Sequence, residues 1–435
     1  MAAGYTCWGR LPIAAGEPLR LRWRDAALPD EGTLLAHGNG RSYGDSCLNP
    51  GGVLLDTRGL DRFTRFDRER GILRAEAGVL LADMLRLTVP AGWFLPVTPG
   101  TRFITLGGAI ANDVHGKNHH VAGTFGRHVR ALELRRSTGE RLTCSPDQNP
   151  DWFAATIGGL GLTGLITWAE IALKPIPSAY VAVETARFGG VDQFIALNDA
   201  SEPSHEYTVA WVDCLARGRN LGRGVFMGGN HARHMARTAA PPLGDPALRV
   251  PFDAPAWLLG RATLSAFNGL YYRRARAGTR VQHLGPFFYP LDGIGQWNRL
   301  YGRRGFYQYQ CVVPRADGGA ALKELLGIVA ASGQGSFLAV LKGFGGLPSP
   351  GLLSFPRPGY TLALDFPNRG RSTLALFERL DRVVEAAGGA LYPAKDARMT
   401  AAGFARYHPR LETFVRFVDP RFSSAFWRRV RPEES

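Results

Sequence analysis

The sequence contains few of the residues that cross-linked or metal-bound proteins depend on. Its five cysteines are scattered, with no CxxC pair and no His/Cys cluster of metal-ligand spacing. This arrangement predicts a reducing compartment and no structural zinc. The five are Cys7, Cys47, Cys144, Cys214 and Cys311.

Acidic residues are also few relative to basic ones. The sequence has 37 Asp and Glu against 52 Lys and Arg, a formal net charge of +15, and nearly all of the excess is arginine. A compositional arginine bias would explain this charge. So would attraction to an anionic partner, such as a phosphate ligand, a membrane surface or nucleic acid.

Long hydrophobic runs are scarce as well. The first residues, MAAGYTCWGR, lack a basic stretch followed by an apolar one, so no secretory signal is expected. The longest uncharged run, 152–169, is broken by four glycines and three threonines, so no transmembrane span is predicted. With 45% hydrophobic and 20% charged residues over 435 positions, the composition is that of a globular protein with room for two domains.

The pattern of apolar residues changes near residue 178. Before this point short apolar strands alternate with glycine loops. After it come three strand–helix–strand units, at 180–212, 307–341 and 360–394. Such units predict an antiparallel sheet with helices on one face, within an α+β fold. Residues 222–280 are rich in proline and arginine and are predicted to form an irregular insert.

Two glycine-rich segments in the N-terminal part indicate a binding function. Residues 37–45, HGNGRSYGD, follow the apolar strand 33–36 and can present consecutive backbone N–H groups to a pyrophosphate. Residues 98–128 hold six glycines and four histidines around one lysine, a composition better suited to wrapping a bound molecule than to filling a core. Together the two segments favour a dinucleotide threaded between them. The first loop leads into no helix, so it does not match a Rossmann fingerprint.

Several of the polar residues also have ordinary structural interpretations. Lys395, before Asp-Ala-Arg, has the pattern of a solvated charge at a strand end, and Gln308 and Gln310 share one face of a strand as exposed polar residues would. His119 and His120 are more typical of structural residues than of catalytic ones. The HxxxHH pattern could bind a metal, but only Asp113 is near as a carboxylate, so no metal is predicted. The segment 257–259, Trp-Leu-Leu, suits either a core helix or a lid that touches lipid.

The order of the motifs resembles one family along nearly the whole chain. The glycine loops resemble the flavin-binding domain of the vanillyl-alcohol-oxidase type. With them, HGNGRSYGDS, PGTRFITLGGAIANDVHGKNHH, GTFGRHV, GGLGLTG, FYPLDGIGQWNRLYG, QYQCVVP, SFLAVLKGFG and LYPAKDARMT are similar to the decaprenylphosphoryl-β-D-ribose 2′-oxidase family. HGKNHH and AKDxR are the most specific of these motifs.

The resemblance implies a domain organisation. Residues 1–178 would form a two-subdomain PCMH-type FAD-binding domain, and residues 179–389 a substrate-binding domain whose antiparallel sheet is covered by helices. Residues 390–435 would return to the FAD-binding domain. FAD would be bound non-covalently, because Arg41 follows Gly40 where related flavoproteins carry a flavin-linked histidine.

The resemblance also implies a reaction. The 2′-hydroxyl of a polyprenyl-phosphoryl-β-D-ribose would be oxidised to a keto group by hydride transfer to flavin N5. A separate NAD(P)-dependent short-chain reductase would then complete an epimerisation to the arabinose form, in cell-wall glycan biosynthesis. The expected location is cytoplasmic, with peripheral contact to an anionic membrane face; a periplasmic location stays open.

The site residues are carried over position by position. Lys395 and His115 are the catalytic candidates, and the sequence does not decide which of them is the base. Cofactor-binding residues would be Gly38, Asn39, Gly40, Arg41, Ser42, Tyr43, Thr98, Pro99, Gly100, Thr101, Gly107, Gly108, Ala109, Asn112, His115, Gly116, Gly123, Gly161, Gly164, Gln310 and Lys395. Substrate-binding residues would be Lys117, Phe288, Gln308, Gln310, Lys342, Thr361 and Ala363.

Three positions depart from the family pattern. Ala363 stands where the mycobacterial-type enzymes carry a cysteine, Thr361 replaces an asparagine, and the tyrosine expected before Pro-Leu-Asp is displaced in Phe288-Tyr289-Pro290. These changes alter the pocket wall and affect the exact substrate more than the reaction class.

Other functions remain open at this level. One is a same-fold FAD oxidase or dehydrogenase of a soluble sugar, alditol or aldonolactone. Another is a catalytically silent flavin-binding scaffold subunit of a glycan-synthesis complex. Nucleic-acid binding is the weakest alternative, because the basic residues are dispersed and no RNA- or DNA-binding module is present.

Overall fold

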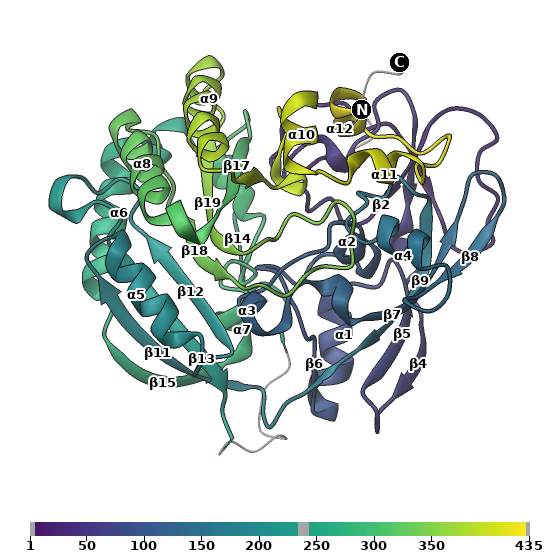
Figure 1. Ribbon diagram of the computed structural model, residues 1–435, viewed down its shortest axis with the longest axis horizontal. Coiled ribbons are helices and arrows are strands. Elements are labelled where there is room, and N and C mark those ends of the chain that lie inside the picture. Colours follow the sequence, from purple (N-terminus) through teal and green to yellow (C-terminus); the bar gives the residue numbers. More distant parts are fainter. Residues whose placement is uncertain (1–4, 234–242, 432–435) are drawn as a thin grey trace.

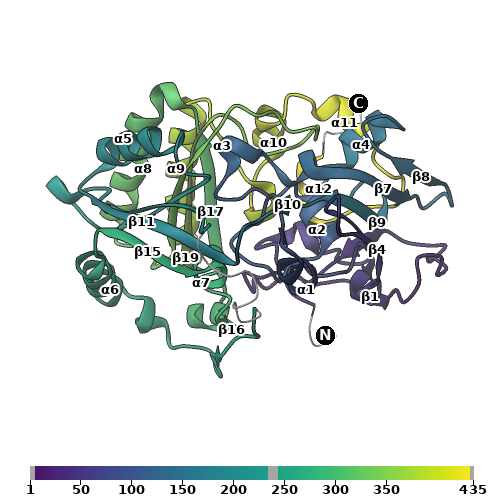
Figure 2. The same cartoon turned by 90° about the horizontal axis from the view of Figure 1, so that it is seen from below.

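The computed structural model describes residues 5–233 and 243–431 and shows two groups of strands side by side (Figure 1, Figure 2). The N-terminal half begins with a small parallel sheet in the order β1-β3-β2. An antiparallel sheet in the order β4-β5-β9-β7-β8 lies beside it. The strands are β1 (Glu17–Arg20), β2 (Leu34–His37), β3 (Val53–Asp56), β4 (Phe63–Asp67), β5 (Ile72–Glu76), β7 (Val129–Arg135), β8 (Arg141–Cys144) and β9 (Leu165–Ala172).

Short helices and one further strand pair complete this half. In α1 (Leu81–Thr88) the apolar residues recur at helical spacing and are buried on one face, as the sequence predicts. The turn Ser137-Thr138-Gly139 between two apolar stretches is typical of a hairpin, and these stretches form β7–β8. The other elements are α2 (Leu106–Ala111), α3 (His119–Ala122), α4 (Pro150–Thr156) and the pair of β6 (Trp93–Phe94) with β10 (Lys174–Pro175).

The C-terminal half is built on an eight-stranded sheet in the order β15-β11-β13-β12-β18-β19-β17-β20. Neighbouring strands in it pair antiparallel, as predicted. Figure 2 shows α5 (Val191–Ser201), α8 (Arg315–Ser332) and α9 (Arg371–Ala386) on one side of the sheet. The strands are β11 (Tyr180–Phe188), β12 (Tyr207–Val212), β13 (Gly224–His231), β15 (Gly278–His283), β17 (Phe306–Val313), β18 (Ala339–Phe344), β19 (Gly359–Pro367) and β20 (Ala390–Leu391).

The prediction that residues 222–280 are irregular is wrong. This stretch contains β13, β14 (Leu248–Arg249), a 3-10 turn at Ala256–Leu259, the 14-residue helix α6 (Arg261–Arg274) and the start of β15. The glycine pair in β13 concealed the strand, because glycine is a poor strand former. The fold needs both glycines: a Cβ on Gly228 would lie 2.8 Å from the His205 ring, and one on Gly229 2.9 Å from Phe287. The part of the insert at 234–242 lies outside the described residues.

The segment after residue 390 packs on the N-terminal half (Figure 1). It forms α10 (Ala401–Tyr407), α11 (Leu411–Val415) and α12 (Ala425–Val430). Phe422 forms an isolated parallel β-bridge with Leu34 of β2. Arg429 forms ion pairs with Asp45 at 2.8 Å and with Asp396 at 3.2 Å. The last described helix therefore holds the end of the first glycine loop.

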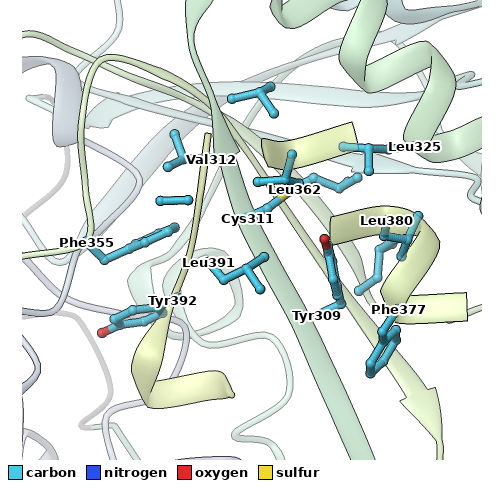
Figure 3. Packing of buried hydrophobic residues seen from close by; sticks show 14 of the residues in the cluster. Tyr309, Cys311, Val312, Leu325, Phe355, Leu362, Phe377, Leu380, Leu391 and Tyr392 are labelled. Atoms are coloured by element: carbon cyan, nitrogen blue, oxygen red, sulfur yellow. The ribbon is translucent and has the colours of Figure 1, made fainter. Parts of the chain in front are cut away.

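The main hydrophobic core lies between the eight-stranded sheet and its helices. Figure 3 shows Tyr309 and Cys311 of β17 and Leu362 of β19 on the side of Leu325, Phe377 and Leu380. Because side chains alternate along a strand, residues 308, 310, 361, 363 and 365 face the opposite side. In the described part of the chain, no helix is long and apolar enough to cross a membrane.

Candidate active site

A cavity of about 850 Å³ lies where the two halves meet. The N-terminal half contributes the loop 38–43, the segment 98–101, the turn 112–117 and glycines after residue 160. The C-terminal half contributes one face of the eight-stranded sheet, and Lys395 enters from the returning segment. Both glycine-rich segments singled out in the sequence therefore meet in one place.

The first glycine loop presents its backbone to this cavity. Gly40 has φ +58°, a conformation that glycine adopts without strain. The Asn39 side chain donates to the Phe103 carbonyl at 2.7 Å, and Arg41 donates to the Asn39 carbonyl and lies over the Trp8 ring. Within the described residues, the four backbone N–H groups from Asn39 to Ser42 find no acceptor. A row of free N–H donors is a binding site for an anion such as a pyrophosphate.

The turn 112–118 is held by the buried carboxylate of Asp113, whose φ of 39° is unusual for a residue other than glycine. Asp113 accepts from the Gly126 N–H at 2.8 Å and from the hydroxyls of Ser349 and Ser354, each at 2.5 Å. These bonds tie the turn to the C-terminal half. Asp113 therefore has a structural role in this turn.

His115 sits at the centre of the cavity wall. Its Nε2 lies 3.0 Å from the amide nitrogen of Gln310, which also donates to Thr361 at 3.3 Å. An amide nitrogen only donates, so Nε2 of His115 accepts and Nδ1 carries the proton. Burial, then the charges of Lys342, His119 and Lys395, hold the pKa of His115 well below 6.5. The imidazole is therefore neutral at physiological pH.

Three of the five lysines of the sequence line the cavity. Burial lowers the pKa of Lys117 to about 7, with a further contribution from Lys342, and lowers that of Lys342 to about 8. Lys117 donates to the Phe287 carbonyl, whereas no hydrogen bond or ion pair to Lys342 occurs among the described residues. Unpaired buried cations favour an anionic ligand.

Lys395 is the third of these lysines. It ends a 3-10 turn, Pro393–Lys395, that follows β20. Its Nζ lies 3.8 Å from the centre of the Tyr43 ring. Burial lowers its pKa from the ordinary 10.5, the charge of Lys342 adds to this effect, and Asp365 opposes it. An amine with a pKa lowered toward neutrality can take up a proton.

The sheet register brings the remaining residues together. Gln308 pairs with Asp365, Gln310 with Ala363, and Lys342 with Thr361. Gln308 and Gln310 are nine-tenths or more buried, so the interpretation of both as exposed strand residues is wrong. Their side chains face the cavity because Tyr309 between them faces α9, where its hydroxyl donates to Asp381.

Asp365 is the functional candidate that the sequence reasoning missed. It is fully buried, does not line the cavity, and accepts from Gln308 Nε2 at 2.6 Å and from the Tyr301 hydroxyl at 3.4 Å. Burial raises the pKa of Asp365 to about 7. Its signal was present: an aspartate at the same strand parity as residues 361 and 363, within an apolar strand.

Exposed apolar side chains are frequent in residues 248–281, a stretch that contributes to the cavity wall. Trp257 is 70% exposed while Leu259 is 8% exposed, so this segment is partly core and partly surface. Other strongly exposed apolar residues of the same stretch are Leu248, Phe252, Phe267, Leu270 and Val281. We call these five residues and Trp257 the apolar patch. Arg249, Phe267 and Arg280 also line the cavity.

Nearly all of the predicted site residues line the cavity. Two do not. Ala109 is buried in the core of the N-terminal half, and Gly123 follows α3, where an added Cβ would clash with the Arg127 side chain. That placement does not support a cofactor role for either. Phe288 lines the cavity, whereas the displaced Tyr289 turns away and its hydroxyl bonds Thr98 at 2.8 Å.

Comparison with known proteins agrees with this geometry. Residues 26–145 match the model of a FAD binding domain. The chain is 40% identical over 415 residues to the decaprenylphosphoryl-β-D-ribose oxidase of Mycolicibacterium smegmatis, covering 92% of this chain and 89% of that protein. It is 36% identical over 369 residues to an uncharacterised protein in the mprA 5′ region of Streptomyces coelicolor, covering 80% and 97%. Cytokinin dehydrogenase 7 of Oryza sativa subsp. japonica is 30% identical over 216 residues, covering 46% and 40%.

The fold, the cavity and these matches define a FAD-dependent oxidoreductase with a PCMH-type cofactor domain. More narrowly, the chain belongs to the decaprenylphosphoryl-β-D-ribose oxidase family. The residues present fit FAD: the free N–H row of the first loop suits its pyrophosphate. A Cβ on Gly100 or Gly161 would meet nothing within 4 Å, so both backbones border open space.

Proposed function

We propose that the protein oxidises the 2′-hydroxyl of a polyprenyl-phosphoryl-β-D-ribose to a keto group, the first half of an epimerisation to the arabinose form. One observation carries this proposal: Lys117, Lys342 and Lys395 converge, with His115, on the cavity that the glycine loops border. The name of the M. smegmatis relative, an oxidase of decaprenylphosphoryl-ribose, supports the substrate class.

Lys395 is our choice for the base. Bound FAD supplies the hydride acceptor. The hydride leaves the carbinol carbon more easily when the hydroxyl proton passes to a base, here Nζ of Lys395, whose pKa is lowered by burial. His115 suits this role poorly, because its Nε2 accepts from Gln310 and its pKa is far below neutral. His115 and Gln310 instead orient the sugar.

Lys117 and Lys342 are proposed to bind the phosphate of the substrate. Each is enclosed and has no carboxylate partner within 4 Å among the described residues. A phosphate entering between them would raise both pKa values and pair two desolvated cations. Gln308, Phe288, Thr361 and Ala363 would complete the pocket wall.

The domain division is likewise a proposal. Residues 1–178 would form the FAD-binding domain, 179–389 the substrate-binding domain, and 390–435 a segment that returns to the first. The sheet boundaries and the ion pairs of Arg429 with Asp45 and Asp396 support it. Non-covalent binding of FAD is supported by His37, whose Nδ1 bonds the Cys47 carbonyl at 2.9 Å and which does not line the cavity.

Contact with an anionic membrane is proposed for the apolar patch. Six exposed arginines share its stretch of sequence: Arg249, Arg261, Arg273, Arg274, Arg276 and Arg280. Apolar side chains beside a dense positive charge suit an anionic bilayer, in which the lipid tail of the substrate would lie. We place the protein in the cytoplasm, at the membrane face.

Vesicle binding tests the membrane proposal. The F252S/W257S variant should lose binding to phosphatidylglycerol vesicles, while W23S should keep it. Trp23 is a matched control, because it is 60% exposed but lies under Arg62, away from the patch. Equal binding by all three proteins, or none by the wild type, would reject membrane contact through this surface.

A second enzyme must consume the product. A ketone becomes the epimeric alcohol only by hydride addition to the opposite face, so a separate NAD(P)-dependent short-chain reductase is the proposed partner. A coupled assay that contains both proteins should release the arabinose epimer, whereas either protein alone should not.

Anaerobic spectroscopy tests the reaction itself. Prenyl-phosphoryl ribose should bleach the oxidised flavin spectrum of the purified protein, and K395M should bleach far more slowly. A persistent spectrum with this lipid but bleaching by a soluble sugar, alditol or aldonolactone would replace the substrate class. Flavin that no alcohol reduces would instead indicate a scaffold subunit.

A further inference from the structure

One part of the cavity is lined by apolar side chains that the proposed oxidation does not use. They come from β12, from β18 with the residue just before it, and from α6. Figure 2 shows α6 on the other side of the eight-stranded sheet from α5, α8 and α9. We call this part the apolar arm, and its residues are Val209, Trp211, Phe267, Tyr271, Leu338 and Val340.

The register of the sheet leads from the proposed active site into the apolar arm. Gln310, at the proposed sugar site, pairs with Ala363, and Ala363 pairs with Val340. Val340 pairs in turn with Trp211. This row crosses four strands, and because neighbouring strands lie about 4.8 Å apart, it extends about 14 Å. Lys342, proposed to bind the phosphate, is two residues from Val340 on the same face of β18, so the arm begins beside both polar subsites.

The wall of the arm formed by α6 is fixed on the sheet. Asn268 of α6 is fully buried and donates to Asp213 at 3.1 Å. Tyr271 packs against Trp211, with ring centres 4.6 Å apart. The indole N–H of Trp211 donates to the Phe337 carbonyl at 2.9 Å, so it is not free to bind a ligand. A wall without a free donor at this position suits hydrocarbon better than a polar group.

The apolar surface of the arm lies inside the sheet and is nevertheless accessible. Leu338, Val340 and Ala363 are only half-buried, although β18 and β19 are interior strands. Such surface gains stability when an apolar ligand covers it. FAD is expected along the glycine loops of the N-terminal half, and the remaining apolar group is the prenyl chain of the proposed substrate. Phe267 belongs both to the arm and to the apolar patch, so the arm connects the phosphate site with the proposed membrane surface.

We propose that the apolar arm binds the first isoprene units of the polyprenyl chain, and that Val340 and Phe267 select a lipid-linked substrate over a soluble sugar phosphate. This inference rests on the proposed substrate class. In that substrate the phosphate joins the ribose to the chain, so a phosphate held by Lys117 and Lys342 places the first carbons of the chain at the start of the arm. A soluble sugar phosphate would leave the arm empty and gain no affinity from it.

Prenyl phosphates that carry no sugar test the arm without turnover. Calorimetry on the FAD-loaded protein should show that geranyl phosphate binds about 10–100-fold more tightly than methyl phosphate, because the chain leaves water. V340F places a ring in the arm and should weaken the binding of geranyl phosphate by about tenfold. Methyl phosphate should bind V340F and the wild type equally, since it does not reach the arm.

Two residues of α6 provide a matched pair of variants. Phe267 is 46% exposed and Leu270 is 48% exposed, but Phe267 lines the cavity and Leu270 does not. F267A should lower the affinity for geranyl phosphate by about fivefold, and L270A should leave it unchanged. Both positions are half-exposed, so both variants should fold, and this pair decides the question if V340F does not fold. F252S/W257S should bind geranyl phosphate like the wild type, because neither residue lines the cavity.

The inference is overturned if geranyl phosphate binds the wild type no more tightly than methyl phosphate does. Equal losses in F267A and L270A would overturn it too, and a loss in F252S/W257S alone would assign the chain to the apolar patch instead. If prenyl-phosphoryl ribose reduces the flavin while chain length has no effect on phosphate binding, the proposed function stands and the arm fails. If the flavin is not reduced but the chain-dependent binding and the loss in F267A are observed, the proposed sugar fails and the arm stands.

Discussion

The ammonium of Lys395 lies 3.8 Å above the centre of the Tyr43 ring. The same two segments are joined through the backbone, because the Tyr43 N–H donates to the Ala394 carbonyl at 3.0 Å. The proposed base is thus placed by the first glycine loop, more than 350 positions earlier in the sequence.

Replacing the aromatic ring under Lys395 should impair catalysis. A desolvated cation–π contact contributes about 2 kcal/mol, so Y43L should lower kcat/KM by about 10–30-fold. Y43F keeps the ring and should stay within about twofold of the wild type, because the face of the ring makes the cation–π contact and the hydroxyl does not. Steady-state kinetics on the prenyl-phosphoryl sugar measures both. Equal losses in the two variants would point to the hydroxyl instead.

Affinity for a phosphate-bearing ligand should fall as the pH rises through the pKa of Lys342. That pKa is about 8 in the free protein and rises when an anion binds, so above pH 8 binding must take up a proton. The dissociation constant should then increase by up to about tenfold per pH unit. Calorimetry in buffers of different ionisation enthalpy detects the proton.

Lysine variants separate this effect from surface charge. K342M should abolish the pH dependence and weaken binding, whereas K323M should do neither. Lys323 is a suitable control because it is on the outer helix α8, paired with Asp192. A K323M protein that binds as poorly as K342M would contradict a local role.

Cysteines introduced on the two faces of β19 should differ in their reactivity toward an alkylating reagent. A363C should react with a small alkylating reagent, because residue 363 lines the cavity, and FAD or substrate should protect it. L362C should remain unreactive in the folded protein, since Leu362 is 1% exposed and faces the helices (Figure 3). Mass spectrometry counts the label. Labelling of L362C faster than A363C would mean that the strand register is wrong.

Removal of Arg429 should loosen the first glycine loop. R429A leaves Asp45 and Asp396, both buried, without their cation, at a cost of about 2–3 kcal/mol in the free energy of unfolding. FAD should dissociate more readily as a result. R431A is the control, because no side-chain partner of Arg431 occurs in the described residues. Urea unfolding and flavin fluorescence measure the two effects.

Local patterns were enough to predict the glycine loops, α1, the β7–β8 hairpin and the helix-covered sheet, because each depends on neighbours in sequence. Strand parity put Gln308 and Gln310 on one face, and the family resemblance assigned that face to the site. Parity alone could not predict their burial, since burial depends on which half of the molecule lies opposite. Asp365 escaped because its burial and its hydrogen bonds to Gln308 and Tyr301 come from residues more than 50 positions away in the sequence. The glycine pair of β13 was taken as a sign of irregular structure. The strand needs glycine there because His205 and Phe287 pack closely against its backbone, which the sequence does not reveal.

The ion pair of Arg429 with Asp45 has a consequence for the synthesis of the protein. The residues that close the first loop are separated by 384 positions, so the loop is completed only when almost all of the chain has left the ribosome. Stable binding of FAD is then expected only after nearly all of the chain has been synthesised. A product truncated before α12 would expose an unclosed cleft, fail to retain flavin, and become a substrate for proteolysis.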